Sequence, residues 1–152
     1  MVPEQIERET IIAAPVERVW ELITRPEHVG TWFGDAGAEI DLRPGGEMTL
    51  RWEEYGTVHA RIERLEPMTL FSYRWAPFQD PGGDEPVAGN STLIEFTLSE
   101  TGEGTRLRVV ESGFSALDTT PERQEALRRG NADGWGVELG HLSEHARVNV
   151  NV

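Results

Sequence analysis

Two histidines near the C-terminal end have a spacing that some zinc-binding helices use. His141 and His145 enclose the sequence HLSEH, and residues four apart lie on one face of a helix. A catalytic zinc ion needs a third protein ligand, and only seven residues follow His145. We therefore expect neither a metal site nor a cofactor.

Two ionisable residues at inward positions of predicted strands are the other candidates for chemistry. Glu111 and Arg8 share the apolar parity of the last and the first predicted strand. Since buried charges need partners, a structural pair between them is the favoured interpretation, and a polar anchor for a ligand is the alternative. Glu111 and Tyr73 are the candidate acid–base groups if the protein is an enzyme.

Large aromatic side chains form a third set. Four of them share the inward parity of neighbouring predicted strands, and three belong to helices that would cover that face. A packed core is the ordinary explanation for such residues, but rings with few aliphatic neighbours could instead line a cavity. With Glu111 added, the predicted ligand-binding residues are Trp32, Phe33, Trp52, Tyr73, Trp75, Phe96, Glu111 and Trp135.

The elements that position these groups follow from periodicity and turn residues. Alternation over residues 6–12 predicts a first strand, and apolar residues at helical spacing after Pro15 predict a helix that stops at Arg25. Thr24 and Glu27 resemble a capping box for a second short helix that ends at Gly34.

The rest of the chain predicts six more strands and one long helix. The strands alternate apolar and charged residues between positions 38 and 109, which is typical of an antiparallel sheet with one covered face. The Pro- and Gly-rich stretch from Ala76 to Asn90 is predicted to be a long loop, either a lid or simply mobile. The helix should begin near Pro121, and Gly130, Gly134 and Gly136 favour a kink or a close approach within it.

Composition limits the class of protein. A chain of 152 residues with 38% hydrophobic and 27% charged residues fits a single folded domain over residues 1–152, without membrane insertion. A net charge of −13 argues against nucleic acid as a partner, and because every basic residue is Arg, a lysine Schiff base is excluded. The absence of cysteine and of a signal peptide favours a cytoplasmic location.

Several segments resemble one known family. "IIAAPVERVWELITRPEHVGTWFG", "DLRPGGEMTLRW", "GTVHARIERLEPMTLFSYRW", "GTRLRVVESGF" and the late Gly134–Trp135 are similar to homologues of the heat-shock-protein ATPase activator, in the START-like (SRPBCC) superfamily. The resemblance covers nearly the whole chain. It implies an α+β helix-grip fold, in which a seven-stranded curved antiparallel sheet wraps around a long C-terminal helix and two short helices follow the first strand.

The resemblance also implies a function, because proteins of this superfamily bind lipids, sterols or polyketides in a cavity between sheet and helix. We expect this chain to bind a small hydrophobic or aromatic molecule, with an entrance near residues 76–90 or near Trp32 and Phe33. A polyketide cyclase or aromatase-like enzyme and a co-chaperone-like protein-binding domain are the alternatives, and a homodimer is left open. If Trp135 lines a void, Trp135→Ala should cost less than about 2 kcal/mol.

Overall fold

The computed structural model describes residues 5–78 and 85–149. Seven strands, three α-helices and one short 3-10 helix make up this part of the chain. In chain order they are β1 (Gln5–Ile12), α1 (Val16–Thr24), α2 (Pro26–Trp32), β2 (Ala38–Ile40), β3 (Glu47–Trp52), β4 (Gly56–Glu66), β5 (Leu70–Trp75), β6 (Thr92–Thr101), β7 (Gly104–Ser112), η1 (Phe114–Ala116) and α3 (Pro121–Asn149).

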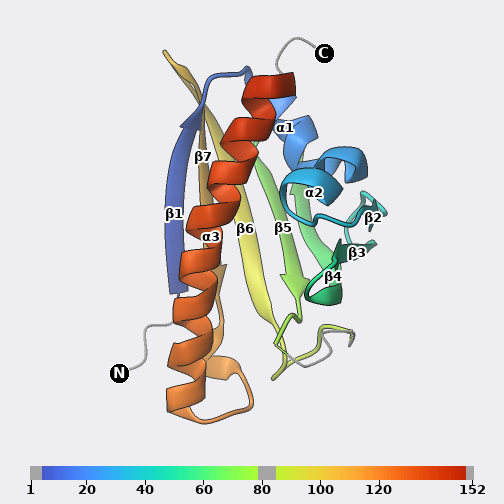
Figure 1. The fold of residues 1–152 in the computed structure, drawn as a ribbon, viewed down its shortest axis with the longest axis vertical. Coiled ribbons are helices and arrows are strands. Elements are labelled where there is room, and N and C mark those ends of the chain that lie inside the picture. Colours follow the sequence, from blue (N-terminus) through green and yellow to red (C-terminus); the bar gives the residue numbers. More distant parts are fainter. Residues whose placement is uncertain (1–4, 79–84, 150–152) are drawn as a thin grey trace.

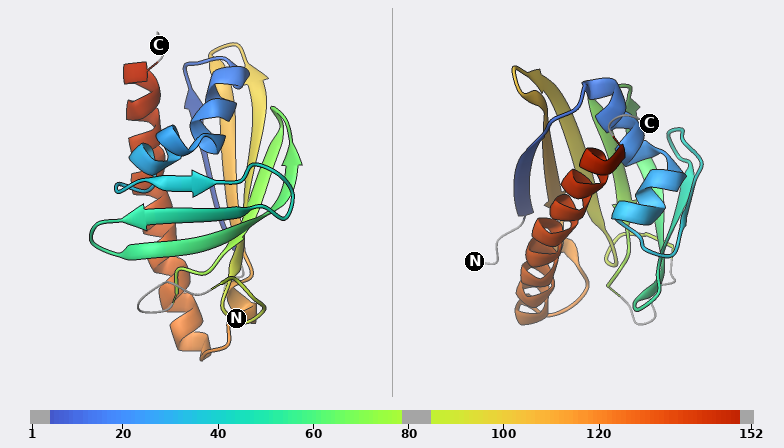
Figure 2. Two further views of the ribbon diagram at one scale, coloured as in Figure 1. Left: turned by 90° about the vertical axis from the view of Figure 1, so that its right-hand side faces the viewer. Right: turned by 45° about the horizontal axis from the view of Figure 1, so that its top comes forward.

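The strands form one antiparallel sheet in the order β1-β7-β6-β5-β4-β3-β2. The first strand therefore pairs with the last one, as the sequence predicts. The sheet curves around α3, which runs along its concave side next to β1 and β7 (Figure 1). Of the two short helices, α2 packs against β2, and α1 contacts β6 and β7 (Figure 2). This arrangement confirms the helix-grip fold.

The ends of the helices follow from proline and backbone hydrogen bonding. Pro26 opens α2 and prevents α1 from continuing, because its ring clashes with a preceding helical turn. The predicted capping box is wrong, since the Thr24 hydroxyl donates to the Trp20 carbonyl of its own helix at 2.7 Å. Arg25 takes the N-cap position of α2 without a side-chain hydrogen bond. The long helix begins at Pro121, as expected.

The glycines of α3 neither break it nor bring another element close. The helix is continuous from Pro121 to Asn149, and a Cβ atom built on Gly130, Gly134 or Gly136 would meet nothing within 4 Å. These positions therefore leave open space beside the helix. The predicted kink or close approach is wrong, and the absence of side chains here shapes the site described below.

Candidate functional site

The carboxylate of Glu111 lies fully buried where α3 crosses the sheet, with 0% of the residue exposed. Glu111 lies on the inner face of the sheet near the end of β7, as the sequence predicts. Four side chains from β5, β6 and α3 donate hydrogen bonds to its two oxygens. The donors are Trp75 Nε1 at 3.0 Å, Thr92 Oγ1 at 2.6 Å, Asn131 Nδ2 at 2.9 and 3.1 Å, and Trp135 Nε1 at 2.8 Å.

Two opposing effects act on the charge of Glu111. Burial raises the pKa of its carboxyl above the ordinary value, while the hydrogen bonds from Thr92, Trp75, Trp135 and Asn131 lower it. The indole and amide groups can only donate at these contacts, so the arrangement suits an ionised carboxylate better than a protonated acid. Both oxygens are occupied, and the side chain links the sheet to α3.

Arg8 does not pair with Glu111. Its guanidinium donates to the backbone carbonyls of Glu7 at 3.0 Å and of Ala132 at 3.5 Å, and the residue is exposed. The residue opposite Glu111 on β1 is Ile6. The favoured structural pair is therefore wrong: β1 is an edge strand, so solvent reaches Arg8 while neutral donors from the interior satisfy Glu111.

An aromatic cluster surrounds the Glu111 donors. Phe33, at the end of α2, stacks on Trp135 with ring centroids 5.2 Å apart and planes 10° apart. Phe33 also stacks on Trp75 at 5.5 Å, and Phe96 meets Trp135 edge to face at 5.7 Å. Such pairs add to the stability supplied by area burial alone. Helices and sheet thus meet through rings, as the sequence suggested.

A pocket of about 690 Å³ opens between α3 and the β3–β4 hairpin. This volume is typical of small-molecule sites, which run from roughly 300 to 1,000 Å³. On α3, Gly130 and Gly134 lie along the pocket and contribute no side chain that would fill it. The aromatic residues that line it are Phe33, Trp52, Tyr55, Trp75 and Trp135.

A second pocket of about 580 Å³ adjoins the first one on the α2 side, and Glu138 lines both. Glu138 is not among the site residues predicted from the sequence, although its spacing of three residues from Trp135 places it one turn further along the same helix face. Its Oε1 lies 3.6 Å from His141 Nδ1, and its buried Oε2 has no hydrogen-bond partner. Burial, opposed by His141 and assisted by the charge of Asp35, raises the pKa of Glu138 to about 7.

The predicted ligand-binding residues occupy three kinds of position. Phe33, Trp52, Trp75 and Trp135 line the larger pocket, and Trp32 lines only the smaller one. Glu111 lies behind the wall that Trp75 and Trp135 form. Tyr73 and Phe96 line neither pocket and are buried in the core. Parity alone does not separate these groups, because pocket and core side chains share one face of the sheet.

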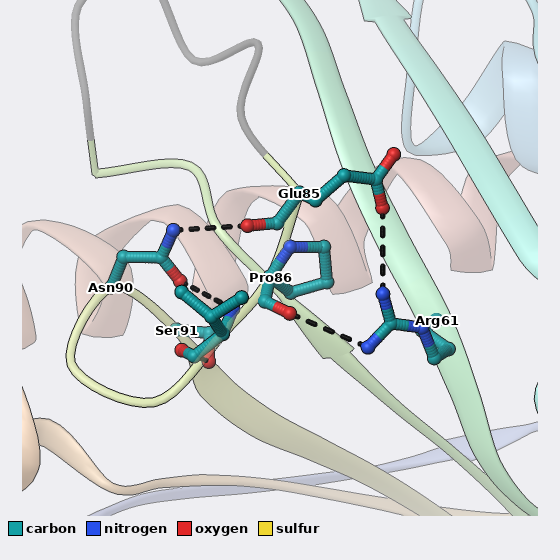
Figure 3. Close-up of polar contacts among 6 residues, drawn as sticks. Arg61, Glu85, Pro86, Asn90 and Ser91 are labelled. Carbon is teal, nitrogen blue, oxygen red and sulfur yellow. Dashed lines mark hydrogen bonds and ion pairs between the residues drawn. The ribbon is translucent and has the colours of Figure 1, made fainter.

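The described part of the 76–90 loop is attached to β4. The Arg61 guanidinium donates to the Pro86 carbonyl at 3.4 Å and lies 3.5 Å from the Glu85 carboxylate (Figure 3). Asn90 closes the returning chain by accepting from Val87 N at 2.8 Å and donating to the Glu85 carbonyl at 3.0 Å (Figure 3). Pro77 lines the larger pocket, so the loop begins at its edge. A lid role stays a prediction, and residues 79–84 lie outside the described part.

His145 contacts a histidine of α2. His28 Nδ1 and His145 Nε2 are 2.9 Å apart, and burial is the main cause that lowers the pKa of both imidazoles. Within residues 5–78 and 85–149, no group of three or more His, Cys, Asp or Glu side chains could hold a metal ion. In the same residues, no helix is long and apolar enough to cross a membrane.

Comparison with family models identifies the class of protein. The model described as "Activator of Hsp90 ATPase homolog 1-like protein" matches residues 13–147. This match covers most of the chain, including α1, α2, the strands after them and nearly all of α3. The chain therefore belongs to this family. A search of curated protein sequences found no match.

Solved structures share the fold. Protein MLL2253 from Mesorhizobium loti has a TM-score of 0.77 at 22% identity, over 95% of this chain and 98% of that one. CalU16 from Micromonospora echinospora has a TM-score of 0.69 at 25% identity, over 93% and 74%. DynU16, from the dynemicin biosynthetic locus, has a TM-score of 0.73 at 21% identity, over 95% of this chain but 48% of that one. This chain thus spans about half of DynU16.

Proposed function

We propose that this protein binds a small apolar or aromatic molecule in the pocket between α3 and the β3–β4 hairpin. The observation that carries the proposal is the lining, in which Phe33, Trp52, Trp75 and Trp135 present rings to a space of about 690 Å³. Ligand sites typically combine such apolar walls with a few polar groups. The origin of DynU16 in a biosynthetic locus is compatible with a small-molecule ligand.

Ligand binding has more support than a reaction in which Glu111 and Tyr73 act as acid and base. Glu111 is fully buried and both its oxygens accept hydrogen bonds, so its geometry favours a structural role. Burial raises the pKa of Tyr73 well above its ordinary value, so its phenol stays protonated, and the residue lines neither pocket. A general base must lie within hydrogen-bond reach of its substrate.

Leucine substitutions at two glycines of α3 test the proposal. Gly134 lines the pocket, and a Cβ atom there would meet nothing within 4 Å, whereas Gly140 is exposed and lines neither pocket. A neutral naphthalene dye should bind the wild type and Gly140→Leu, and quench tryptophan fluorescence in both. Gly134→Leu should lose at least tenfold in dye affinity without losing stability, because leucine is the better helix former.

Two results would contradict the proposal. The first is that the dye does not bind the folded wild-type protein. The second is that the dye binds Gly134→Leu as tightly as Gly140→Leu, which would place the dye elsewhere. Far-UV circular dichroism and urea denaturation of all three proteins show whether the variants are folded.

A further inference from the structure

Glu138 has a carboxylate oxygen that no described group satisfies. It stands on α3 between the two pockets, and 20% of its side chain is exposed. Oε2 is buried without a hydrogen-bond partner, whereas Oε1 lies near His141. A buried carboxylate oxygen left unpaired is costly, so the carboxylate gains a strong hydrogen bond when a donor in the pocket reaches it.

The charges around the pockets are unbalanced. Besides Glu138, the larger pocket has Glu54 in its lining, and the smaller pocket has Asp35 and Glu144. Glu144 is paired with Arg147, but among the described residues that line either pocket there is no arginine. The pockets therefore favour a cation over an anion.

The walls suit a cation as well. The indole faces of Trp52 and Trp75 and the Tyr55 phenol are electron-rich surfaces along the larger pocket. A positive charge near such a face is attracted to the ring, more strongly when water is excluded. Aromatic walls and an unpaired carboxylate together are the combination that recognises an amine on an apolar body.

We propose that the ligand is an apolar or aromatic molecule that carries a protonated amine, and that the carboxylate of Glu138 accepts a hydrogen bond from its ammonium group. This inference rests on the proposed function, because it assigns the ligand class of the same pocket. The rings of Phe33 and Trp135 contact the apolar body, and Glu138 sets the preference among ligands of equal size.

Protonation of Glu138 gives the inference a pH dependence. Its pKa of about 7 means that the carboxyl is mostly ionised at pH 8 and mostly protonated at pH 6. The charged or titratable groups around it are His141 on α3, Asp35 after α2, Tyr73 on β5, and Glu54 and Tyr55 in the β3–β4 turn. If ammonium binds the ionised form only, its affinity should fall by up to about tenfold between pH 8 and pH 6.

Three naphthalene probes of one size test this ligand class. They are 1-naphthylmethylamine, which is protonated at pH 8, its neutral analogue 1-naphthalenemethanol, and the anion 1-naphthoate. At pH 8 the wild type should bind the amine at least tenfold more tightly than the alcohol, and the anion most weakly. Glu138→Gln should abolish the preference for the amine and its pH dependence, while the affinity for the alcohol changes less than twofold.

Glu122→Gln is the matched control, because it removes one acid from the exposed first turn of the same helix. It should keep the full amine preference. Equal binding of amine and alcohol by the wild type, or an amine preference that survives in Glu138→Gln, would overturn the inference while the pocket remains a binding site. If no probe binds the wild type, the proposed function itself fails.

Discussion

Two glutamates on the inner side of this fold differ in how they are satisfied. Glu111 has four donor side chains around its carboxylate, whereas Glu138 has one distant imidazole and an unpaired oxygen. Burial raises the pKa of both, but in Glu111 the donors oppose it. A carboxylate whose partners all come from the protein links elements together, and one that lacks a partner is available to a ligand.

The largest expected effect is at Trp135, which is 2% exposed, stacks on Phe33 and donates to Glu111. Trp135→Ala should destabilise the protein by about 4 kcal/mol, because it removes packed area and a donor to a buried carboxylate. This value exceeds the sequence-based one of less than about 2 kcal/mol, because Trp135 borders the pocket but also packs on Phe33 and donates to Glu111. Urea denaturation measures it.

Two further tryptophan variants separate the part of this stability loss that comes from the hydrogen bond from the part that comes from packing. Trp135→Phe keeps the ring stack and removes only the donor, so a loss of about 1–2 kcal/mol is expected. Trp52→Ala, at a half-buried residue that lines both pockets, should cost less than about 2 kcal/mol. Equal losses for Trp135→Ala and Trp52→Ala would mean that the Glu111 side of the molecule is no better packed than the pocket side.

Glu111→Gln is expected to have the next largest effect. The amide nitrogen would have to face Asn131 Nδ2 and, depending on its orientation, either Trp135 Nε1 or Trp75 Nε1 with Thr92 Oγ1, so at least one buried hydrogen bond becomes a repulsive contact. The free energy of unfolding should fall by about 3 kcal/mol at pH 7. Denaturation with a concurrent circular dichroism spectrum measures it, and a neutral result would contradict the assignment of Glu111 as an ionised structural carboxylate.

Glu138→Gln should have the smallest effect, and in the opposite direction. Since the pKa of Glu138 is raised from 4.5 to about 7, the folded state binds more protons than the unfolded state between these values. The stability of the wild type therefore falls as pH rises through this window. The variant should match the wild type below pH 4.5 and exceed it by about 1 kcal/mol at pH 8, a figure reduced for partial solvent access.

Thermal or urea denaturation of the Glu138→Gln variant at pH 4, 6 and 8, with Glu122→Gln as the control, gives the pH dependence of this difference. A destabilised Glu138→Gln at pH 8 would show that its carboxylate is satisfied within the protein. The contrast between the two glutamates would then disappear, and the amine proposal would lose its main support.

Much of the fold could be predicted from local sequence. Alternation identified the seven strands, Pro26 separated the two short helices, and Pro121 marked the start of α3, because strand parity and proline geometry act within a few residues. The error at Thr24 has a local cause too: its hydroxyl has two acceptable partners, and the carbonyl one turn back is the one it bonds.

The site depended on contacts between residues far apart in sequence. Strand parity placed Glu111 inside, but its partners come from β5, β6 and α3. Local sequence therefore could not show that Arg8 does not contact Glu111, or that Trp135 donates a hydrogen bond to it. Apolar residues recur only weakly at helical spacing in α3, so the sequence did not indicate that Glu138 lies on its inner face.

The order of elements, the inward position of Glu111 and the supply of large rings follow from local periodicity and composition. Which rings are core and which line a pocket, and which glutamate is left with an unpaired oxygen, follow from the packing of α3 against the sheet. The reason is that burial and hydrogen bonding depend on what the curved sheet brings against α3, and side-chain partners there are separated by up to dozens of residues.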